Sequence, residues 1–278
     1  MDTHLLAPEL QQKWYKLLGL IESKESILSA LSGGIDSSLL LYAINFALPH
    51  KVIAATVEHE LIPADEVAEA EKLAESLNVP WHLVQMNALN IQQVAENAPD
   101  RCYHCKTHMF SLLKELAVKH SIKTIADGAN LDDSLVYRPG NRAAQEAEIF
   151  RPLCETGLTK QEIRLLGKAA GLVNWSKPAA ACLATRFPYN DKITTEKLFQ
   201  VAAGEDILRQ LGFHNCRLRL HGEICRIEAE KEALPSLLEK ADTLTELLRG
   251  LGFIYICADI NGLQSGSMDY TLTKIDSK

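Results

Sequence analysis

The 278-residue chain is long enough for one large domain or two ordinary ones, and its 47% of apolar residues can fill a core. Its formal charge of −7, with acidic and basic residues interleaved, disfavours a nucleic-acid partner. No apolar run reaches the roughly 18 to 20 residues of a membrane span, and the start lacks the character of a signal peptide, so we expect a cytoplasmic protein without a membrane partner.

Strand and helix patterns alternate along the first part of the chain. Apolar periodicity predicts a helix at residues 8–21 and a strand at 26–31 that runs into a glycine-rich loop. The pattern then repeats, with strands at 51–57, 81–84 and 123–128 and helices at 64–77, 108–118 and 159–172. This order predicts an α/β fold with a doubly wound parallel sheet and ligands at the carboxyl ends of its strands.

A proline-containing stretch at residues 175–189 predicts a loop and a domain junction. Beyond it the order changes to a helix, a two-stranded hairpin, a second helix and a last strand at 253–257. We therefore expect a first domain of residues 1–188 and a small α+β domain of residues 189–278.

The segment S-G-G-I-D-S-S, residues 32–38, joins a predicted strand to a helix. Gly33 and Gly34 have no Cβ, so the backbone can approach an anion that the helix N-terminus attracts. Asp36 is a candidate N-cap or Mg²⁺ ligand. Further donors come from the loop hydroxyls of Ser32, Ser37 and Ser38. The alternative is an ordinary strand-to-helix turn, and the lysine of the Walker loop is missing.

The seven cysteines are an odd number without an export signal, so a disulfide framework is improbable. Cys102 and Cys105 form a CxxC just before a predicted helix, which suits a zinc site, a redox dithiol, an iron–sulfur cluster or incidental spacing. Cys182 lies among alanines and is either an accessible thiolate, stabilised by flanking Lys177 and Arg186, or a buried thiol. The others lie in apolar stretches and are expected to be buried: Cys154, Cys216, Cys225 and Cys257.

Alternation in C-R-L-R-L-H-G places Arg217, Arg219 and His221 on one face of a strand. Arginines side by side can grip a phosphate, although a solvated face has the same pattern. Arg138 and Arg142 are further candidates for anion contacts, with surface charges as the alternative. In A-D-G-A-N-L-D-D, residues 126–133, the two adjacent aspartates favour a helix-start cap when taken alone.

The glycine loop resembles the signature of the N-type ATP pyrophosphatases, the PP-loop superfamily, which split ATP between its α- and β-phosphates and adenylate a substrate. Together with P-D-R-C-Y-H-C-K, D-G-A-N-L-D-D, Y-R-P-G-N-R-A-A and K-P-A-A-A-C-L-A-T-R-F-P-Y, it is similar to the LarE family over nearly the whole chain. These ATP-dependent sulfur transferases help to make the nickel-pincer nucleotide cofactor of lactate racemase.

The resemblance implies the PP-loop (adenine nucleotide alpha-hydrolase-like) fold for the first domain, and substrate binding and oligomerisation for the second. It implies that ATP with Mg²⁺ is held by Ser32, Gly33, Gly34, Asp36, Ser37, Ser38, Asp132 and Asp133. It also implies that a carboxylate of pyridinium-3,5-biscarboxylic acid mononucleotide becomes an acyl-adenylate and then a thiocarboxylate. For the phosphate of this small-molecule nucleotide substrate we assign Arg217, Arg219 and Arg186.

Cys182 occupies the family's sulfur-donor position and is the catalytic residue that the resemblance implies. In one branch this cysteine gives up its own sulfur and becomes dehydroalanine. In the other, three cysteines hold a 4Fe–4S cluster whose open iron carries sulfide. Because this chain has Cys102, Cys105 and Cys182, we favour the cluster, with sulfide or a persulfide as donor.

Three other functions stay open at this point. An adenylating amidotransferase would need an ammonia source, and a transfer-RNA thiolase would need a basic surface, which the charge of −7 opposes. A non-enzymatic iron–sulfur or sulfide carrier could have kept the same fold. The family further implies a homo-oligomer.

Overall fold

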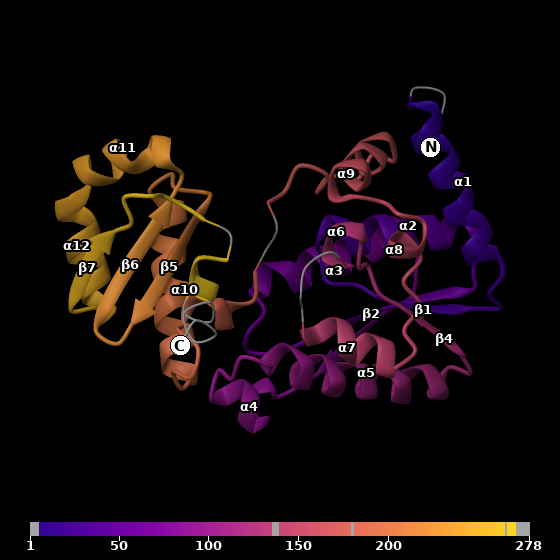
Figure 1. Ribbon diagram of the computed structural model, residues 1–278, viewed down its shortest axis with the longest axis horizontal. Helices are drawn as coiled ribbons and strands as arrows, with labels where there is room; N and C mark the ends of the chain where they lie inside the picture. Colours follow the sequence, from indigo (N-terminus) through magenta and orange to yellow (C-terminus); the bar gives the residue numbers. More distant parts are fainter. Residues whose placement is uncertain (1–5, 135–138, 179–180, 265, 271–278) are drawn as a thin grey trace. The chain divides into compact units, whose positions relative to one another are not determined.

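The computed structural model describes residues 6–134, 139–178, 181–264 and 266–270 (Figure 1). By its internal contacts the chain forms two compact units, Met1–Asn87 with Cys102–Ala180 and Ala88–Arg101 with Ala181–Lys278. This division follows Ala180, whereas the boundary expected from the sequence follows residue 188. In addition, the segment Ala88–Arg101 belongs to the second unit, which the sequence did not predict.

The first unit is built on a parallel sheet of four strands, which confirms the predicted fold class. The strands are β1 (Ile27–Ala30), β2 (Val52–Glu58), β3 (Trp81–Gln85) and β4 (Thr124–Ala126), in the order β3-β2-β1-β4. The chain moves from β1 outward to β3 and then returns to pair β4 with the other side of β1. The strand order therefore reverses between β1 and β4, where doubly wound sheets bind their ligands.

Helices cover both faces of this sheet. In Figure 1, α5 and α7 lie on one side of it, and α2, α6, α8 and α9 lie on the other. The helices of this unit are α1 (Pro8–Glu22), α2 (Ile35–Ala47), α3 (Ala64–Ser76), α5 (Arg101–Lys119), α6 (Leu131–Ser134), α7 (Pro139–Glu146), α8 (Pro152–Glu155) and α9 (Lys160–Ala169). Of these, α5 begins at the last residue of the segment assigned to the second unit.

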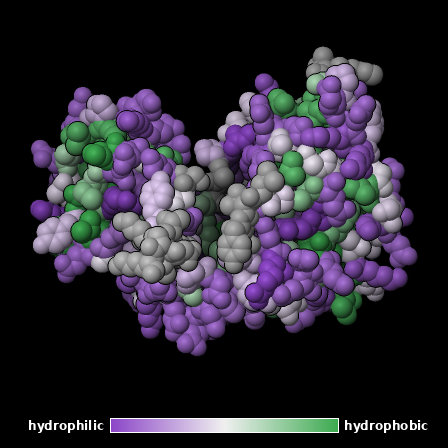
Figure 2. All heavy atoms as spheres, viewed as in Figure 1, coloured by the Kyte–Doolittle hydropathy of each residue, from purple (hydrophilic) through white to green (hydrophobic). Residues whose placement is uncertain are grey.

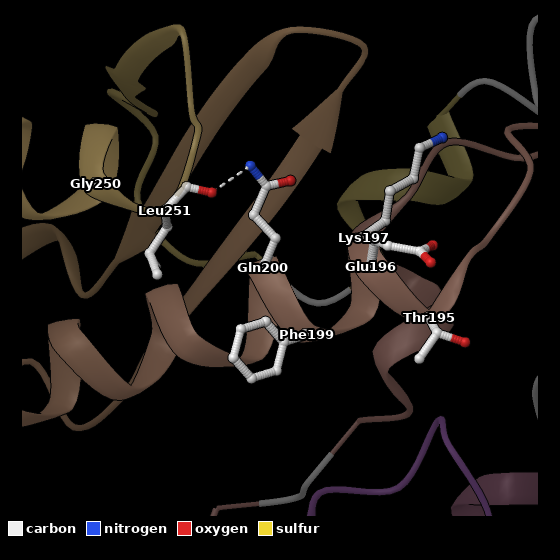
Figure 3. Close-up of a pocket in the computed structure, with 7 residues that line it drawn as sticks. All are labelled: Thr195, Glu196, Lys197, Phe199, Gln200, Gly250 and Leu251. Carbon is white, nitrogen blue, oxygen red and sulfur yellow. Dashed lines mark hydrogen bonds between the residues drawn. The ribbon is translucent and has the colours of Figure 1, made fainter.

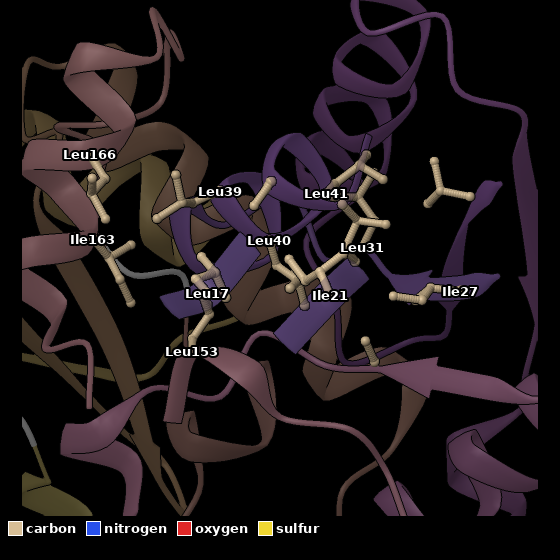
Figure 4. Packing of buried hydrophobic residues seen from close by; sticks show 14 of the residues in the cluster. Leu17, Ile21, Ile27, Leu31, Leu39, Leu40, Leu41, Leu153, Ile163 and Leu166 are labelled. Carbon is tan, nitrogen blue, oxygen red and sulfur yellow. The ribbon is translucent and has the colours of Figure 1, made fainter. Parts of the chain in front are cut away.

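The core of the first unit surrounds α2, which packs against α1, α9 and β1. Because α2 has neighbours on several sides, its sequence I-D-S-S-L-L-L-Y-A-I-N-F-A is apolar nearly all round. Figure 4 shows the packed side chains, which include Leu17, Ile21, Ile27, Leu31, Leu39, Leu40, Leu41, Leu153, Ile163 and Leu166. Each contributes about 1.5–3 kcal/mol by burial. This packing fixes the start of α2 at the end of β1.

The second unit contains the predicted hairpin in a small mixed sheet. β5 (Cys216–His221) pairs antiparallel with β6 (Ile224–Ala229), and β7 (Tyr255–Ala258) runs parallel to β6. Gly222 in the hairpin turn has a φ of +61°, which glycine adopts without strain. The helices are α4 (Gln92–Ala95), α10 (Thr195–Gln210), α11 (Leu234–Glu239) and α12 (Ala241–Gly250), and short 3₁₀ turns are η1 (Ala88–Asn90), η2 (Leu183–Arg186), η3 (Lys231–Ala233) and η4 (Ser267–Asp269).

Hydrophilic residues cover most of the face shown in Figure 2, with smaller hydrophobic patches between them. Among the described residues, no helix is both long and apolar enough to cross a membrane.

Candidate active site

The loop between β1 and α2 is held together by its own hydroxyl groups. The Oγ atoms of Ser37 and Ser38 donate to the carbonyl oxygen of Gly34 at 3.0 and 2.9 Å, and the N–H of Ser32 donates to Ser37 Oγ at 3.1 Å. Ser37 and Ser38 are both buried. Their hydroxyl groups therefore stabilise the shape of the loop. The groups suited to donate hydrogen bonds to an anion are then the backbone N–H groups at the start of α2.

Two glycines allow other segments to approach this loop. Gly33 has a φ of +81°, and a Cβ on it would lie 2.5 Å from the carbonyl oxygen of Glu66. A Cβ on Gly128, just after β4, would lie 2.7 Å from the backbone nitrogen of Ser37. The ends of β1 and β4 thus meet at the loop, as the strand order requires.

Replacing Gly128 with alanine is expected to displace the start of α2, because the added methyl group meets rigid backbone. We expect a loss of about 1–3 kcal/mol in the free energy of unfolding, measured by denaturant titration, together with weaker ATP binding. Gly19→Ala in α1 is the control, since nothing lies within 4 Å of its Cβ position. A Gly128→Ala protein as stable as Gly19→Ala would contradict this packing.

Asp36 lies in the first turn of α2, but the N-cap residue is Gly34 and no side chain caps this helix. The N-cap role considered for Asp36 is therefore wrong. Its Oδ2 atom instead accepts a hydrogen bond from Lys160 Nζ at 2.5 Å, and both side chains are about a quarter exposed, at 23% and 30%. Lys160, the first residue of α9, thus places an ammonium group at this loop, whose own sequence contains no lysine.

Both aspartates at the end of the acidic motif act as helix caps. Asp133 and Asn130 exchange hydrogen bonds, each between the backbone N–H of one and the side-chain oxygen of the other, at 3.2 Å. Asp132 Oδ2 accepts from the backbone N–H of Lys160 at 2.8 Å, which caps α9. Sequence reasoning missed Asp127, which is buried and pairs with Arg151 at 3.1 Å, although its place directly after β4 was a usable signal.

Cys102 and Cys105 lie within the first turns of α5 and not before the helix, so their three-residue spacing places them on one helix face. Cys102 is exposed and Cys105 is half-buried. Helix α7 packs closely here, because a Cβ on Gly140 would lie 2.8 Å from Lys106 Cδ and 3.5 Å from the carbonyl oxygen of Cys102. Helix α7 therefore packs against the turn of α5 that contains the CxxC.

The sequence offered Arg138 and Arg142 as further candidates for anion contacts. Arg142 of α7 stacks over the ring of Tyr103 at 3.8 Å and forms an ion pair with Glu146 at 3.1 Å. Arg138 lies outside the described residues. Because Tyr103 belongs to α5, Arg142 links α7 to α5 through this contact.

Cys182 is exposed and belongs to the second unit, directly before η2. Its flanking cations are engaged by carboxylates, Lys177 by Glu66 at 2.5 Å and Arg186 by Glu205 at 2.8 Å. Over the described parts of the chain, no three His, Cys, Asp or Glu side chains form a group that could hold a metal ion. The predicted cysteine set draws on both units.

The arginines assigned to the substrate phosphate gather near Glu205 and Glu228. Arg186 donates to both carboxylate oxygens of Glu205 at 2.8 and 3.0 Å, and Arg219 donates twice to Glu228 Oε2 at 3.0 and 2.9 Å. Both arginines are buried, which favours a structural role. Arg217 is half-buried, and burial together with the charge of Arg186 lowers its pKa.

The remaining cysteines divide into two groups. Cys216 and Cys225 are buried as predicted, and burial raises their pKa values to about 11 and about 12. Cys154 is half-buried, and Cys257 is exposed, so the prediction for Cys257 was wrong. A groove in the second unit, shown in Figure 3, contains none of the predicted site residues and is lined by Thr195, Glu196, Lys197, Phe199, Gln200, Gly250 and Leu251.

A parallel sheet with this glycine loop at its switch point defines an ATP pyrophosphatase of the PP-loop class. The family model described as asparagine synthase matches residues 20–120. Over 266 residues the chain is 34% identical to pyridinium-3,5-bisthiocarboxylic acid mononucleotide synthase of Lactiplantibacillus plantarum, covering 95% of this chain and 96% of the relative. The chain therefore belongs to the LarE family and is an ATP-using sulfurtransferase.

Two other relatives mark the breadth of the similarity. An uncharacterized protein of Synechocystis is 33% identical over 267 residues, 95% of this chain and 100% of the relative. A tRNA-cytidine(32) 2-sulfurtransferase of Bdellovibrio bacteriovorus is 23% identical over 182 residues, 59% of this chain and 68% of the relative. The second match covers less of the chain at lower identity.

Proposed function

We propose that this enzyme converts the carboxylates of pyridinium-3,5-biscarboxylic acid mononucleotide to thiocarboxylates at the expense of ATP. The observation that carries this proposal is the near full-length similarity to a synthase named for the bisthiocarboxylic product. We further propose that this reaction is a step of nickel-pincer nucleotide synthesis and thus of lactate racemase maturation. The enzyme would act in the cytoplasm as a homo-oligomer.

In the first stage a carboxylate oxygen of the substrate attacks the α-phosphorus of ATP, which forms an acyl-adenylate and releases pyrophosphate. In the second stage a sulfur nucleophile attacks the acyl carbon and AMP leaves with the attacking oxygen. Each round therefore exchanges one carboxylate oxygen for sulfur. The substrate ends with a thiocarboxylate, and ATP ends as AMP and pyrophosphate.

For ATP we propose the loop residues Ser32, Gly33 and Gly34 through their backbone, shaped by the hydroxyls of Ser37 and Ser38. Asp36 is the partly exposed carboxylate of the loop and suits Mg²⁺, which prefers carboxylate oxygens. Asp132 and Asp133 support this site through the caps of α6 and α9. To these we add Lys160, whose ammonium group lies at the loop and can neutralise charge on the departing pyrophosphate.

For sulfur we propose Cys182, together with Cys102 and Cys105. Contacts within the second unit support this set, because Asn97 Nδ2 donates to the carbonyl oxygens of Phe187 and Pro188 at 3.1 and 2.7 Å. The segment that leads into Cys102 is thereby fixed to the segment that follows Cys182.

The chemistry of these side chains suits an iron–sulfur cluster, because they are three thiols and two of them share one helix face. A cluster held by these cysteines would leave one iron open for sulfide. Without a cluster, the Cys182 thiolate would attack the acyl carbon and displace AMP. Elimination from the resulting thioester would then release the thiocarboxylate and leave dehydroalanine at position 182.

Iron and acid-labile sulfide analysis of anaerobically prepared protein separates these two sulfur sources. We expect about four iron and four sulfide per chain, with a visible charge-transfer band, as for a cubane cluster. The cluster proposal fails if both are absent and the mass of the peptide containing Cys182 falls by one hydrogen sulfide after turnover.

For the phosphate of the substrate we propose Arg217 foremost, because its side chain is partly exposed on β5, whereas Arg186 and Arg219 are buried. Arg217→Ala is expected to weaken binding of the pyridinium nucleotide by about ten- to a hundredfold while ATP binding stays within about twofold, as for loss of a charged hydrogen bond. Calorimetric titration of each ligand measures the difference. Equal losses for both ligands would contradict this assignment.

Three competing functions predict different dependences of pyrophosphate release. A sulfur insertase releases pyrophosphate when the pyridinium dicarboxylate is added, whereas a transfer-RNA thiolase requires RNA. An adenylating amidotransferase would also release pyrophosphate but would form an amide from ammonia. A sulfide carrier would release none under either condition.

A further inference from the structure

Asn174 lies in the segment after α9 and reaches back to the glycine loop. Its Nδ2 atom donates to the carbonyl oxygen of Gly33 at 2.8 Å and to Ser38 Oγ at 2.9 Å. Ser38 uses its hydroxyl hydrogen on Gly34 O, so its oxygen can only accept from Asn174. Because both partners are acceptors, the amide nitrogen of Asn174 has to face the loop.

Hydrogen bonds determine the direction in which the carbonyl groups of Gly33 and Gly34 point. Gly33 O accepts from Asn174, and Gly34 O accepts from the hydroxyls of Ser37 and Ser38 and from the backbone N–H of Ser38 at 3.1 Å. Both carbonyl oxygens are therefore engaged by the protein interior. An anion at the loop then meets N–H groups without two repelling oxygens beside them.

The same segment also contacts Glu66, a second neighbour of Gly33. Lys177 Nζ pairs with Glu66 Oε1 at 2.5 Å, and Glu66 Oε2 lies 3.2 Å from the Cβ position of Gly33. Burial raises the pKa of Glu66, which the hydrogen bond from Lys177 opposes. Arg164 of α9 anchors the segment by donating to the carbonyl oxygen of Lys177 at 3.0 Å.

We propose that Asn174 is a positioning residue for the adenylation step, which orients the phosphate loop and ties it to the segment that leads toward Cys182. This inference rests on the proposed use of ATP by the loop. Asn174 itself does not touch the reacting atoms. It acts by turning Gly33 O away from the place where the departing pyrophosphate is held.

Asn174→Ala is expected to weaken the binding of ATP and of pyrophosphate by about ten- to a hundredfold, because the loop carbonyl loses its partner. Binding of adenosine, which has no phosphate, is expected to stay within about twofold of the wild type. Asn174→Asp has the same shape but would place a carboxylate oxygen against Gly33 O, so its losses should be larger. This isosteric variant also serves if the alanine variant folds poorly.

Asn45→Ala is the matched control. Asn45 lies on the same helix as Ser38 and donates to the carbonyl oxygen of Leu77 at 3.0 Å, so its removal costs a comparable hydrogen bond outside the loop. We expect Asn45→Ala to lower the melting temperature while affinities for ATP and pyrophosphate stay unchanged.

The experiment titrates wild type and the three variants with ATP, pyrophosphate and adenosine by calorimetry, below the melting temperature of each. The inference is overturned if Asn174→Ala and Asn174→Asp bind pyrophosphate like the wild type, or lose adenosine affinity in equal measure. Failure of the proposed function has a different signature. In that case wild type shows no pyrophosphate release with the pyridinium dicarboxylate, although the affinities can still differ between variants.

Discussion

Cys182→Ala is expected to abolish sulfur transfer, with a loss of at least about a thousandfold, as when a nucleophile is removed. The sulfur atom at position 182 is needed in both proposed routes, as the donated atom or as a cluster ligand. Adenylation uses the loop of the first unit and should stay within about threefold of the wild type. Mass spectrometry of the thiocarboxylate and exchange of labelled pyrophosphate into ATP measure the two stages separately.

Cys257→Ala is the matched control for Cys182→Ala, because Cys257 is also exposed and lies in the second unit. It is expected to transfer sulfur like the wild type. A Cys182→Ala protein that still forms thiocarboxylate would remove Cys182 from the mechanism, and parallel loss of both stages would indicate misfolding.

Lys160→Met is expected to lower the rate of pyrophosphate formation by about a hundred- to a thousandfold, because it removes a positive charge placed where negative charge leaves. Methionine keeps the aliphatic stem, so the packing of α9 should survive. Initial rates over a range of Mg–ATP concentrations give kcat and KM. We expect kcat to fall more than KM rises, since the charge acts mainly on the departing group.

Lys168→Met provides the comparison on the same helix. Lys168 lies 4.8 Å over the ring of Trp175, within the last turn of α9. We expect pyrophosphate formation by this variant at the wild-type rate. If Lys160→Met matched Lys168→Met in rate, the proposed role of Lys160 would be wrong.

The sheet and the glycine loop could be predicted because their signals are local. Strand and helix periods differ, and S-G-G-I-D-S-S carries its turn chemistry within seven residues. The pairing of Lys160 with Asp36 joins residues 124 positions apart, which no local pattern encodes. Its one available signal was the T-K-Q-E sequence, where Thr159 and Glu162 form the capping box that begins α9 at Lys160.

Residue types that serve two purposes limit what a local sequence pattern can predict. Cys257 has apolar neighbours in sequence, but β7 is an edge strand and its alternate side chains face outward. Arginine suits a phosphate and a glutamate equally, and Glu205 and Glu228 engage Arg186 and Arg219 in the folded unit. The N-cap at Gly34 depends on backbone geometry that the sequence does not reveal.

The acyl-adenylate itself can be tested most directly with substrate whose carboxylates carry a heavy oxygen isotope. The pyridinium dicarboxylate is incubated with ATP, sulfide and the enzyme, and the AMP product is analysed by mass spectrometry. If the carboxylate attacks the α-phosphorus, one heavy oxygen appears in AMP for each thiocarboxylate formed. AMP without the label, alongside thiocarboxylate formation, would contradict adenylation of the substrate carboxylate by this enzyme.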